Sequence, residues 1–155
     1  MTRSAGYGVE VVAMTGGGSE LLDRTTTQVQ GPLRALVIDD VETVRATITD
    51  ILTSFGAEVR SVDTAARACA TVGDFKPHLV ISDVFMPDQD GIELISELKG
   101  RGSFPDLIFV TGSDPFYAKS ACMIAQGNGF RVRGFVLKPF RMSHFKEFID
   151  LYEVN

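Results

Sequence analysis

Three carboxylates and one lysine of this 155-residue chain stand at the ends of short apolar runs. Asp39 and Asp40 follow one run, Asp83 follows a second, and Lys138 follows a third. Crowded carboxylates repel one another and favour protonation unless a cation lies among them. Oxygen ligands in an open cluster suit Mg²⁺, which keeps several waters and binds phosphate oxygens. With a lysine beside them, these residues predict phosphoryl transfer, which depends mainly on positioning and electrostatic stabilisation.

A hydroxyl group and an acceptor carboxylate would complete such a site. Thr111 follows a further apolar run and could offer its hydroxyl to the same phosphoryl group. A carboxylate that accepts the group forms an acyl phosphate. Taken singly, Asp39 and Asp40 could be solvated loop acids and Asp83 a turn or helix cap. Their occurrence together at the ends of neighbouring strands is the stronger indication.

Alternating strand and helix patterns from residue 33 onward would bring these side chains together. Strands are predicted at 33–38, 57–62, 79–81, 107–110 and 130–137, and helices at 41–55, 64–75, 92–98, 116–126 and 143–152, with Thr64 as an N-cap. Five successive β–α units indicate a doubly wound α/β fold, a parallel sheet with helices on both faces. Ligands of such sheets bind outside the carboxyl ends of the strands, where the acids lie.

Composition predicts one cytoplasmic domain that binds neither nucleic acid nor membranes. The net charge is −5, and Arg131 and Arg133 form only a small basic spot that we expect to be solvated. Cys69 and Cys122 match no metal-binding or redox spacing, which predicts buried, reduced thiols. The sequence contains no apolar run of membrane-spanning length, and we expect no signal peptide.

Residues 1–31 differ in composition from the rest of the chain. They contain three consecutive glycines and a polar run, with apolar residues only near 9–14 and 21–22. The glycines are not a phosphate-binding loop, because no Gly-Lys-Ser/Thr sequence follows. We expect a flexible or partly ordered extension, with a short docked strand or helix as the alternative, and a domain that spans residues 32–155.

Taken in order, the motifs form a specific set. They are Asp39-Asp40, Asp83 within Asp-Val-Phe-Met-Pro-Asp-Gln-Asp-Gly, Thr111, and Lys138-Pro139-Phe140. This set resembles the receiver domain of bacterial two-component response regulators, from about residue 33 to the C-terminus. The resemblance implies a five-stranded parallel sheet in the order 2-1-3-4-5 with five helices, a flavodoxin-like three-layer sandwich.

The resemblance also implies a role for each acid. Asp83 resembles the phospho-acceptor, and Asp40 resembles a direct Mg²⁺ ligand beside it. Asp39 resembles the acid that holds metal-bound water, and the backbone carbonyl of Phe85 corresponds to the remaining protein ligand. The implied cofactor is therefore Mg²⁺, bound by Asp39, Asp40, Asp83 and the Phe85 carbonyl.

Three further residues match the switch of the family. Thr111 and Lys138 resemble the pair that contacts the phosphoryl group, and Phe135 resembles the aromatic residue whose inward turn couples to Thr111. The alternative for Phe135 is a strand aromatic packed in the core. The implied partners are a sensor histidine kinase or phosphotransfer protein, and then a downstream protein or output domain. A phosphorylation-dependent homodimer is a further implied assembly.

The region before Lys138 departs from the family pattern. From Thr111 to Lys138 there are 138 − 111 = 27 positions, more than in compact single-domain members, and the extra length lies within 118–134. Residues 125–139 resemble receivers associated with cyclic-diguanylate phosphodiesterase regulators. No such output domain follows within these 155 residues, which predicts a stand-alone receiver or a fragment of a larger regulator.

Two alternatives to a phosphorylation switch stay open. A haloacid-dehalogenase-type phosphatase also uses a strand-end aspartate and Mg²⁺. It needs a second acid two positions later, however, and Val41 stands at that distance from Asp39. A receiver that has lost phosphorylation would act only as an interaction or dimerisation module. We expect no enzymatic activity beyond self-catalysed phosphoryl transfer and dephosphorylation.

Overall fold

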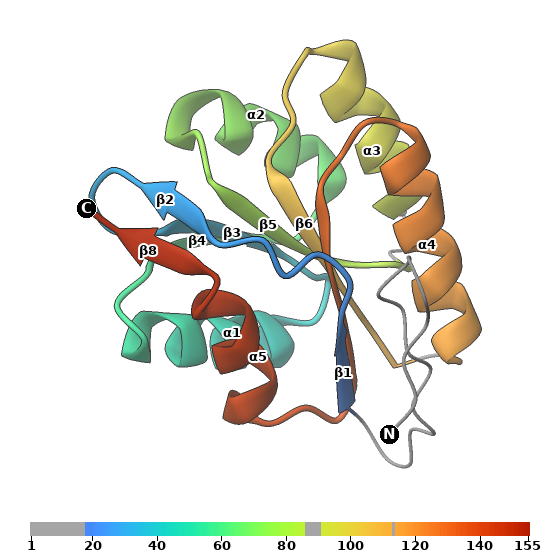
Figure 1. Cartoon of the computed structure of the whole chain (residues 1–155). Coiled ribbons are helices and arrows are strands. Elements are labelled where there is room, and N and C mark those ends of the chain that lie inside the picture. Colours follow the sequence, from blue (N-terminus) through green and yellow to red (C-terminus); the bar gives the residue numbers. More distant parts are fainter. Residues whose placement is uncertain (1–17, 86–90, 113) are drawn as a thin grey trace.

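The computed structural model describes residues 18–85, 91–112 and 114–155 (Figure 1). The elements in chain order are β1 (Gly18–Leu21), β2 (Thr27–Val29), β3 (Arg34–Ile38), α1 (Glu42–Ser54), β4 (Glu58–Val62), α2 (Ala65–Phe75), β5 (Leu79–Asp83), α3 (Gly91–Gly100), β6 (Asp106–Thr111), α4 (Pro115–Gly127), β7 (Val132–Leu137), α5 (Met142–Ile149) and β8 (Tyr152–Val154). Among the described residues, no helix has both the length and the apolar character that crossing a bilayer requires.

A six-stranded sheet forms the centre of the fold, and its strands lie in the order β1-β7-β6-β5-β3-β4. Strands β3 to β7 run parallel to their neighbours, whereas β1 pairs antiparallel with β7. A second, two-stranded sheet is formed by β2 and β8. The prediction of a doubly wound fold with five helices is confirmed, but the prediction of a purely parallel, five-stranded sheet is wrong. Without β1, the outer edge of β7 would expose unpaired backbone N–H and C=O groups. Strand β1 pairs with this edge.

The core lies in two layers, one on each face of the sheet. Successive strand side chains point to opposite faces. On β3, Leu36 and Ile38 therefore pack against α2, α3 and α4, while Ala35 and Val37 pack against α1 and α5. Figure 1 shows the same division, with α1 and α5 on one side of the sheet. Burial on both faces explains the continuous apolar runs that predicted the strands.

Both cysteines are free and buried, as the sequence predicted. Cys69 lies on α2 and Cys122 on α4, in the same core layer. Burial raises the pKa of Cys69 to about 11 and that of Cys122 to about 12. Thr64 accepts a hydrogen bond from the backbone N–H of Arg67 at 3.2 Å, so the predicted N-cap of α2 is confirmed.

The two ends of the described chain add strands to the predicted elements. Residues 18–21 and 27–29 form strands, which matches the alternative of a short docked strand, while residues 1–17 lie outside the described residues. At the other end, the helix predicted over 143–152 stops at Ile149, and Tyr152 begins β8. Strands β2 and β8 pair in parallel and satisfy each other's backbone groups, whereas β1 pairs with β7.

Arg133 connects these added strands to the central sheet. Its side chain is fully buried, contrary to the expectation of a solvated basic spot, whereas Arg131 remains 40% exposed. The Arg133 Nε donates to Asp106 at 3.1 Å and to the Tyr152 hydroxyl at 3.3 Å, and Tyr152 in turn donates to Asp106 at 2.8 Å. The guanidinium also donates to oxygen atoms of Asp23, Thr25 and Thr27.

The close contact between β1 and β7 depends on a glycine. Gly134 has a φ of +151°, and a Cβ there would lie 1.9 Å from the Glu20 carbonyl oxygen and 2.9 Å from the Phe148 ring. We therefore expect Gly134→Ala to lower the free energy of unfolding by at least about 2 kcal/mol, because β1 must shift or the backbone must strain. Urea unfolding followed by circular dichroism measures this.

Gly73→Ala is the matched control for that variant. Gly73 lies inside α2, and a Cβ there would meet nothing within 4 Å. Alanine should raise the free energy of unfolding by about 0.5–1 kcal/mol at such a helical position. Equal stabilities of the two variants would contradict the steric role of Gly134.

Candidate functional site

The carboxyl ends of four parallel strands meet at one edge of the sheet and carry the predicted site. Asp39 and Asp40 follow β3, Asp83 ends β5, Thr111 ends β6, and Lys138 follows β7. The register keeps these ends level, since Asp83 is paired with Val110 and Thr111 with Leu137. Residues far apart in the sequence thus reach one place because their strands run in the same direction.

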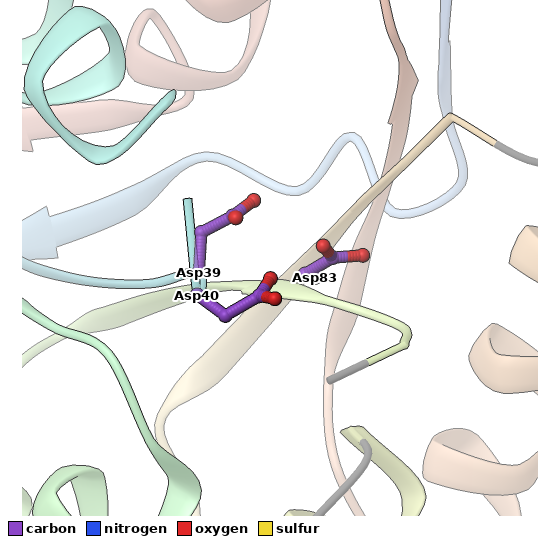
Figure 2. A group of neighbouring side chains, drawn as sticks. All are labelled: Asp39, Asp40 and Asp83. Carbon is purple, nitrogen blue, oxygen red and sulfur yellow. The ribbon is translucent and has the colours of Figure 1, made fainter. Parts of the chain in front are cut away.

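The three acids form one cluster, as the sequence predicted. One carboxylate oxygen from each of Asp39, Asp40 and Asp83 lies within 4.8 Å of the others. Figure 2 shows all three side chains directed toward the same region. Asp39 and Asp83 are buried, with 2% and 8% of their surfaces exposed, whereas Asp40 is exposed. The cluster therefore has a protected floor and an open side.

Lys138 lies between the two buried acids. Its Nζ is 3.0 Å from Asp39 Oδ2 and 3.3 Å from Asp83 Oδ2. The other oxygens accept backbone hydrogen bonds, Asp39 Oδ1 from Val41 at 2.9 Å and Asp83 Oδ1 from Phe85 at 3.2 Å. The ammonium group supplies one positive charge to a site with three carboxylates.

The pKa shifts in the site follow from burial and from these contacts. Burial raises the pKa of Asp83; Lys138 lowers it, the charge of Asp39 raises it, and the net shift is upward. For Lys138, burial lowers the pKa, but the charges of Asp83 and Asp39 and its hydrogen bonds to both outweigh burial and raise it. The lysine therefore stays cationic, and the cluster favours additional positive charge.

Thr111 and Phe135, the two residues of the predicted switch, lie on the neighbouring strands β6 and β7. Thr111 is buried at the end of β6, and its carbonyl oxygen accepts from the backbone N–H of Lys138 at 2.9 Å. Phe135 is fully buried on β7, paired with Phe109 of β6, and packs in the core layer of α2, α3 and α4. Part of the loop after Asp83, residues 86–90, lies outside the described residues.

Three exposed aromatic rings lie near the site, those of Phe85, Phe116 and Tyr117. No role was predicted for these rings from the sequence, which gave a role only to the backbone carbonyl of Phe85. Phe85, two residues after Asp83, contacts Tyr117 with ring centroids 5.4 Å apart, and Tyr117 contacts Phe116 at 5.7 Å. Their exposed fractions range from 48% to 67%. The sequence did contain a signal for the exposed rings of α4. Ala118 and Ala121 lie on the buried face of this helix, and Phe116 and Tyr117 precede them in the sequence.

The donor set fits a hard divalent cation. All three side chains offer oxygen atoms, and the exposed Asp40 leaves one side of the cluster accessible to water and to a phosphate-bearing partner. Oxygen-only ligands of this number suit Mg²⁺, which retains several waters. The arrangement can hold a metal ion beside a carboxylate nucleophile and a fixed ammonium group.

Comparisons with known proteins identify one family. A family model described as the response regulator receiver domain matches residues 35–150. The DNA-binding transcriptional regulator NtrC of Azospirillum brasilense is 32% identical over 118 residues, which cover 76% of this chain and 23% of that protein. Protein PilG of Pseudomonas aeruginosa is 26% identical, and the match covers 70% of this chain and 78% of PilG.

Solved structures show the same fold. Chemotaxis protein CheY4 of Vibrio cholerae superposes with a TM-score of 0.67 at 20% identity, covering 77% of this chain and 98% of that one. NtrX of Brucella abortus gives a TM-score of 0.67 at 26% identity, covering 77% of this chain and 26% of that one. The chain thus spans about a quarter of the length of NtrC and NtrX, and most of the length of PilG and CheY4.

Proposed function

Because the chain belongs to the response regulator receiver family, we propose that it is a phosphorylation switch whose acceptor is Asp83. The observation that carries the assignment is the position of Lys138, within 3.3 Å of both Asp39 and Asp83 at the edge where four strands end. Asp83 is the acid of this cluster that ends a central strand between two site-bearing neighbours. Its carboxylate accepts hydrogen bonds from Lys138 and from the backbone N–H of Phe85.

The transfer forms one bond and breaks another. An Asp83 carboxylate oxygen attacks the phosphorus atom, and the bond from phosphorus to the donor's nitrogen or oxygen breaks, leaving an acyl phosphate. Asp40, Asp83 and the Phe85 carbonyl would hold Mg²⁺, with Asp39 bound through water. When bound, the ion supplies positive charge against the phosphoryl oxygens. Lys138 favours the ionised form of Asp83 against the effect of burial, and it would then contact the phosphoryl group together with the Thr111 hydroxyl.

The switch would act through the face formed by α4, β7 and α5. Movement of Thr111 toward the phosphoryl group would vacate space for Phe135, which is buried on the neighbouring strand. In this chain β1 covers the edge of β7, so partners meet β1 together with α4 and α5. The exposed apolar side chains of Met123 and Ile124 on α4 support a protein contact there.

The wider setting rests on the family and the sequence pattern. We propose a sensor histidine kinase or phosphotransfer protein as donor, a cytoplasmic location, and an output through a downstream protein, a further domain or a homodimer. The association with cyclic-diguanylate phosphodiesterase regulators is supported by the pattern of residues 125–139. Residues 118–134, where the sequence pattern places the extra length, comprise most of α4, the turn after it and the start of β7.

Labelling with a small phosphodonor tests the proposal. After incubation with acetyl phosphate and Mg²⁺, intact mass spectrometry should show the mass of one added phosphoryl group, and chelation of Mg²⁺ should prevent the addition. No addition, combined with no binding of Mg²⁺ and beryllofluoride, would instead identify an interaction module that works without phosphorylation. Steady turnover of a phosphomonoester would identify a phosphatase.

Asp40→Asn should weaken the metal site without removing the acceptor. One of three carboxylates is lost, and Asp40 is exposed, so the fold is little affected. We expect at least about tenfold weaker Mg²⁺ binding, corresponding to about 1.4 kcal/mol, and labelling that recovers at high Mg²⁺. Isothermal titration calorimetry with Mg²⁺ measures the affinity. Unchanged affinity would place the ion away from Asp40.

A further inference from the structure

A cleft of about 410 Å³ lies at the opposite end of the sheet from the acidic cluster. One wall is β2, and the other is built from residues 76–78 before β5 and 102–105 before β6. Asp106 and Tyr152, both buried, line its floor. The volume lies within the range of small-molecule sites. The added strands β2 and β8 thus help to enclose a space distinct from the phosphorylation site.

The cleft carries an excess of positive charge. Among the residues that line it, Lys76 and Arg131 are cationic and Asp106 is the single acid. The Asp106 carboxylate is already satisfied, because it accepts hydrogen bonds from Arg131, from the buried Arg133 and from Tyr152. Among the described residues, Lys76 has no carboxylate within 4 Å and so forms no ion pair. A ligand would therefore meet cations rather than a free carboxylate.

His78 adds a neutral donor to this rim. Its Nδ1 accepts the backbone N–H of Arg34 at 2.9 Å, so the proton of the neutral ring sits on Nε2. Burial and the charge of Arg34 lower the pKa of His78, while Asp106 raises it, and the net shift is downward. The ring therefore stays neutral near pH 7 and keeps this tautomer.

The remaining lining is apolar and partly aromatic. The Phe104 ring is 47% exposed and is held from behind by Phe130, with centroids 4.9 Å apart. Pro77, Pro105 and Val72 complete this part of the cleft. A fixed, exposed ring beside prolines offers a surface for a planar or apolar group.

We propose that this cleft binds a small organic anion, a phosphate ester or carboxylate with a planar body. Lys76 and Arg131 would take the anionic group, His78 would donate a hydrogen bond, and Phe104 would contact the planar part. The phosphorylation site plays no part in this binding, because β5, β6 and β7 carry the two sites at opposite ends.

Amide NMR of the full chain without Mg²⁺ tests the proposal with adenosine 5′-monophosphate, benzoate, inorganic phosphate and adenosine as probes. With the nucleotide, with benzoate or with both, we expect saturable amide shifts at residues 76–78, 102–106 and 131. Each organic anion that binds should do so at least tenfold more tightly than adenosine. Equal binding of inorganic phosphate would overturn the requirement for an organic body. Shifts confined to the acidic cluster, or no saturable shifts with either organic anion, would overturn the site.

Lys76→Asn provides the matching variant. Lys76 has a φ of 50°, and asparagine tolerates this left-handed conformation, so the fold should be retained. We expect about tenfold weaker binding of the anionic probe that binds the unmodified chain. Lys119→Asn, on α4 and outside the cleft, is the control that should leave binding unchanged. Equal affinities of the two variants would contradict the role of Lys76.

Discussion

Asp83→Asn will abolish phosphoryl labelling of the chain by acetyl phosphate. The amide lacks the anionic oxygen that attacks phosphorus, while its oxygen can still accept the N–H of Phe85. The neighbouring acids Asp39 and Asp40 follow β3 rather than ending β5, and both are assigned to Mg²⁺ in the proposed site, so we expect neither to replace Asp83 as acceptor. Intact mass after incubation with Mg²⁺ should therefore show no added phosphoryl group.

Asp114→Asn is the matched control for this result. Asp114 is an exposed acid that caps α4 through the N–H of Phe116, and asparagine can cap in the same way. Its labelling should equal that of the unmodified chain. Undiminished labelling of Asp83→Asn would move the acceptor to another residue, and peptide mapping of the labelled protein would identify it.

Asp83→Asn should not lower the stability of the fold. The pKa of Asp83 is higher in the folded chain than in the unfolded chain, so the ionised carboxylate destabilises the fold. This loss of stability develops as the pH rises from the unfolded pKa to the folded pKa. A neutral asparagine removes this loss. We expect an unfolding temperature at pH 7 equal to or above that of the unmodified chain, measured by calorimetry, so lost labelling cannot be ascribed to unfolding.

Arg133→Met will lower the free energy of unfolding by about 3–5 kcal/mol, because it removes one partner of a buried ion pair. Arg133 is fully buried against Asp106 at 3.1 Å, and methionine would leave that carboxylate with less compensation in the interior. It would also remove the donors to Thr25 and Thr27. Urea unfolding measures the loss, and hydrogen exchange should show β2 and β8 opening first.

Arg131→Met is a control with the same contact distance. Arg131 also lies 3.1 Å from Asp106, but its side chain is 40% exposed and its charge is screened by solvent. We expect a loss of only about 0–1 kcal/mol. Similar losses for the two variants would mean that burial does not distinguish the two arginines.

The grouping of polar residues at the strand ends could be predicted, because these residue types stand next to apolar runs in the sequence. Asp83 and Lys138 follow strands whose burial on both faces makes them continuous in the sequence, and parallel pairing then brings the ends together. The helices were predicted from apolar residues that recur at helical spacing. Even the weakly buried strand β4 was predicted, since Gly56 ends the preceding helix pattern.

The added strands could not be located by the same means, although a short docked strand was the alternative for residues 1–31. Strands β2 and β8 have three residues each, too few for an alternating pattern, and β1 follows a glycine run that indicates a loop. The burial of Arg133 depends on partners from three separate segments, so its residue type indicated solvent exposure. Only the pairing of distant segments reveals both features.

The pairing of β1 with β7 changes what counts as the smallest working unit of this protein. A fragment trimmed to begin at residue 32 would match the family's outline, yet it would expose the backbone edge of β7 and deprive β8 of its partner. Bare strand edges pair with other chains. Baits for partner searches should therefore begin at or before Gly18, or self-association of the trimmed fragment will be mistaken for signalling.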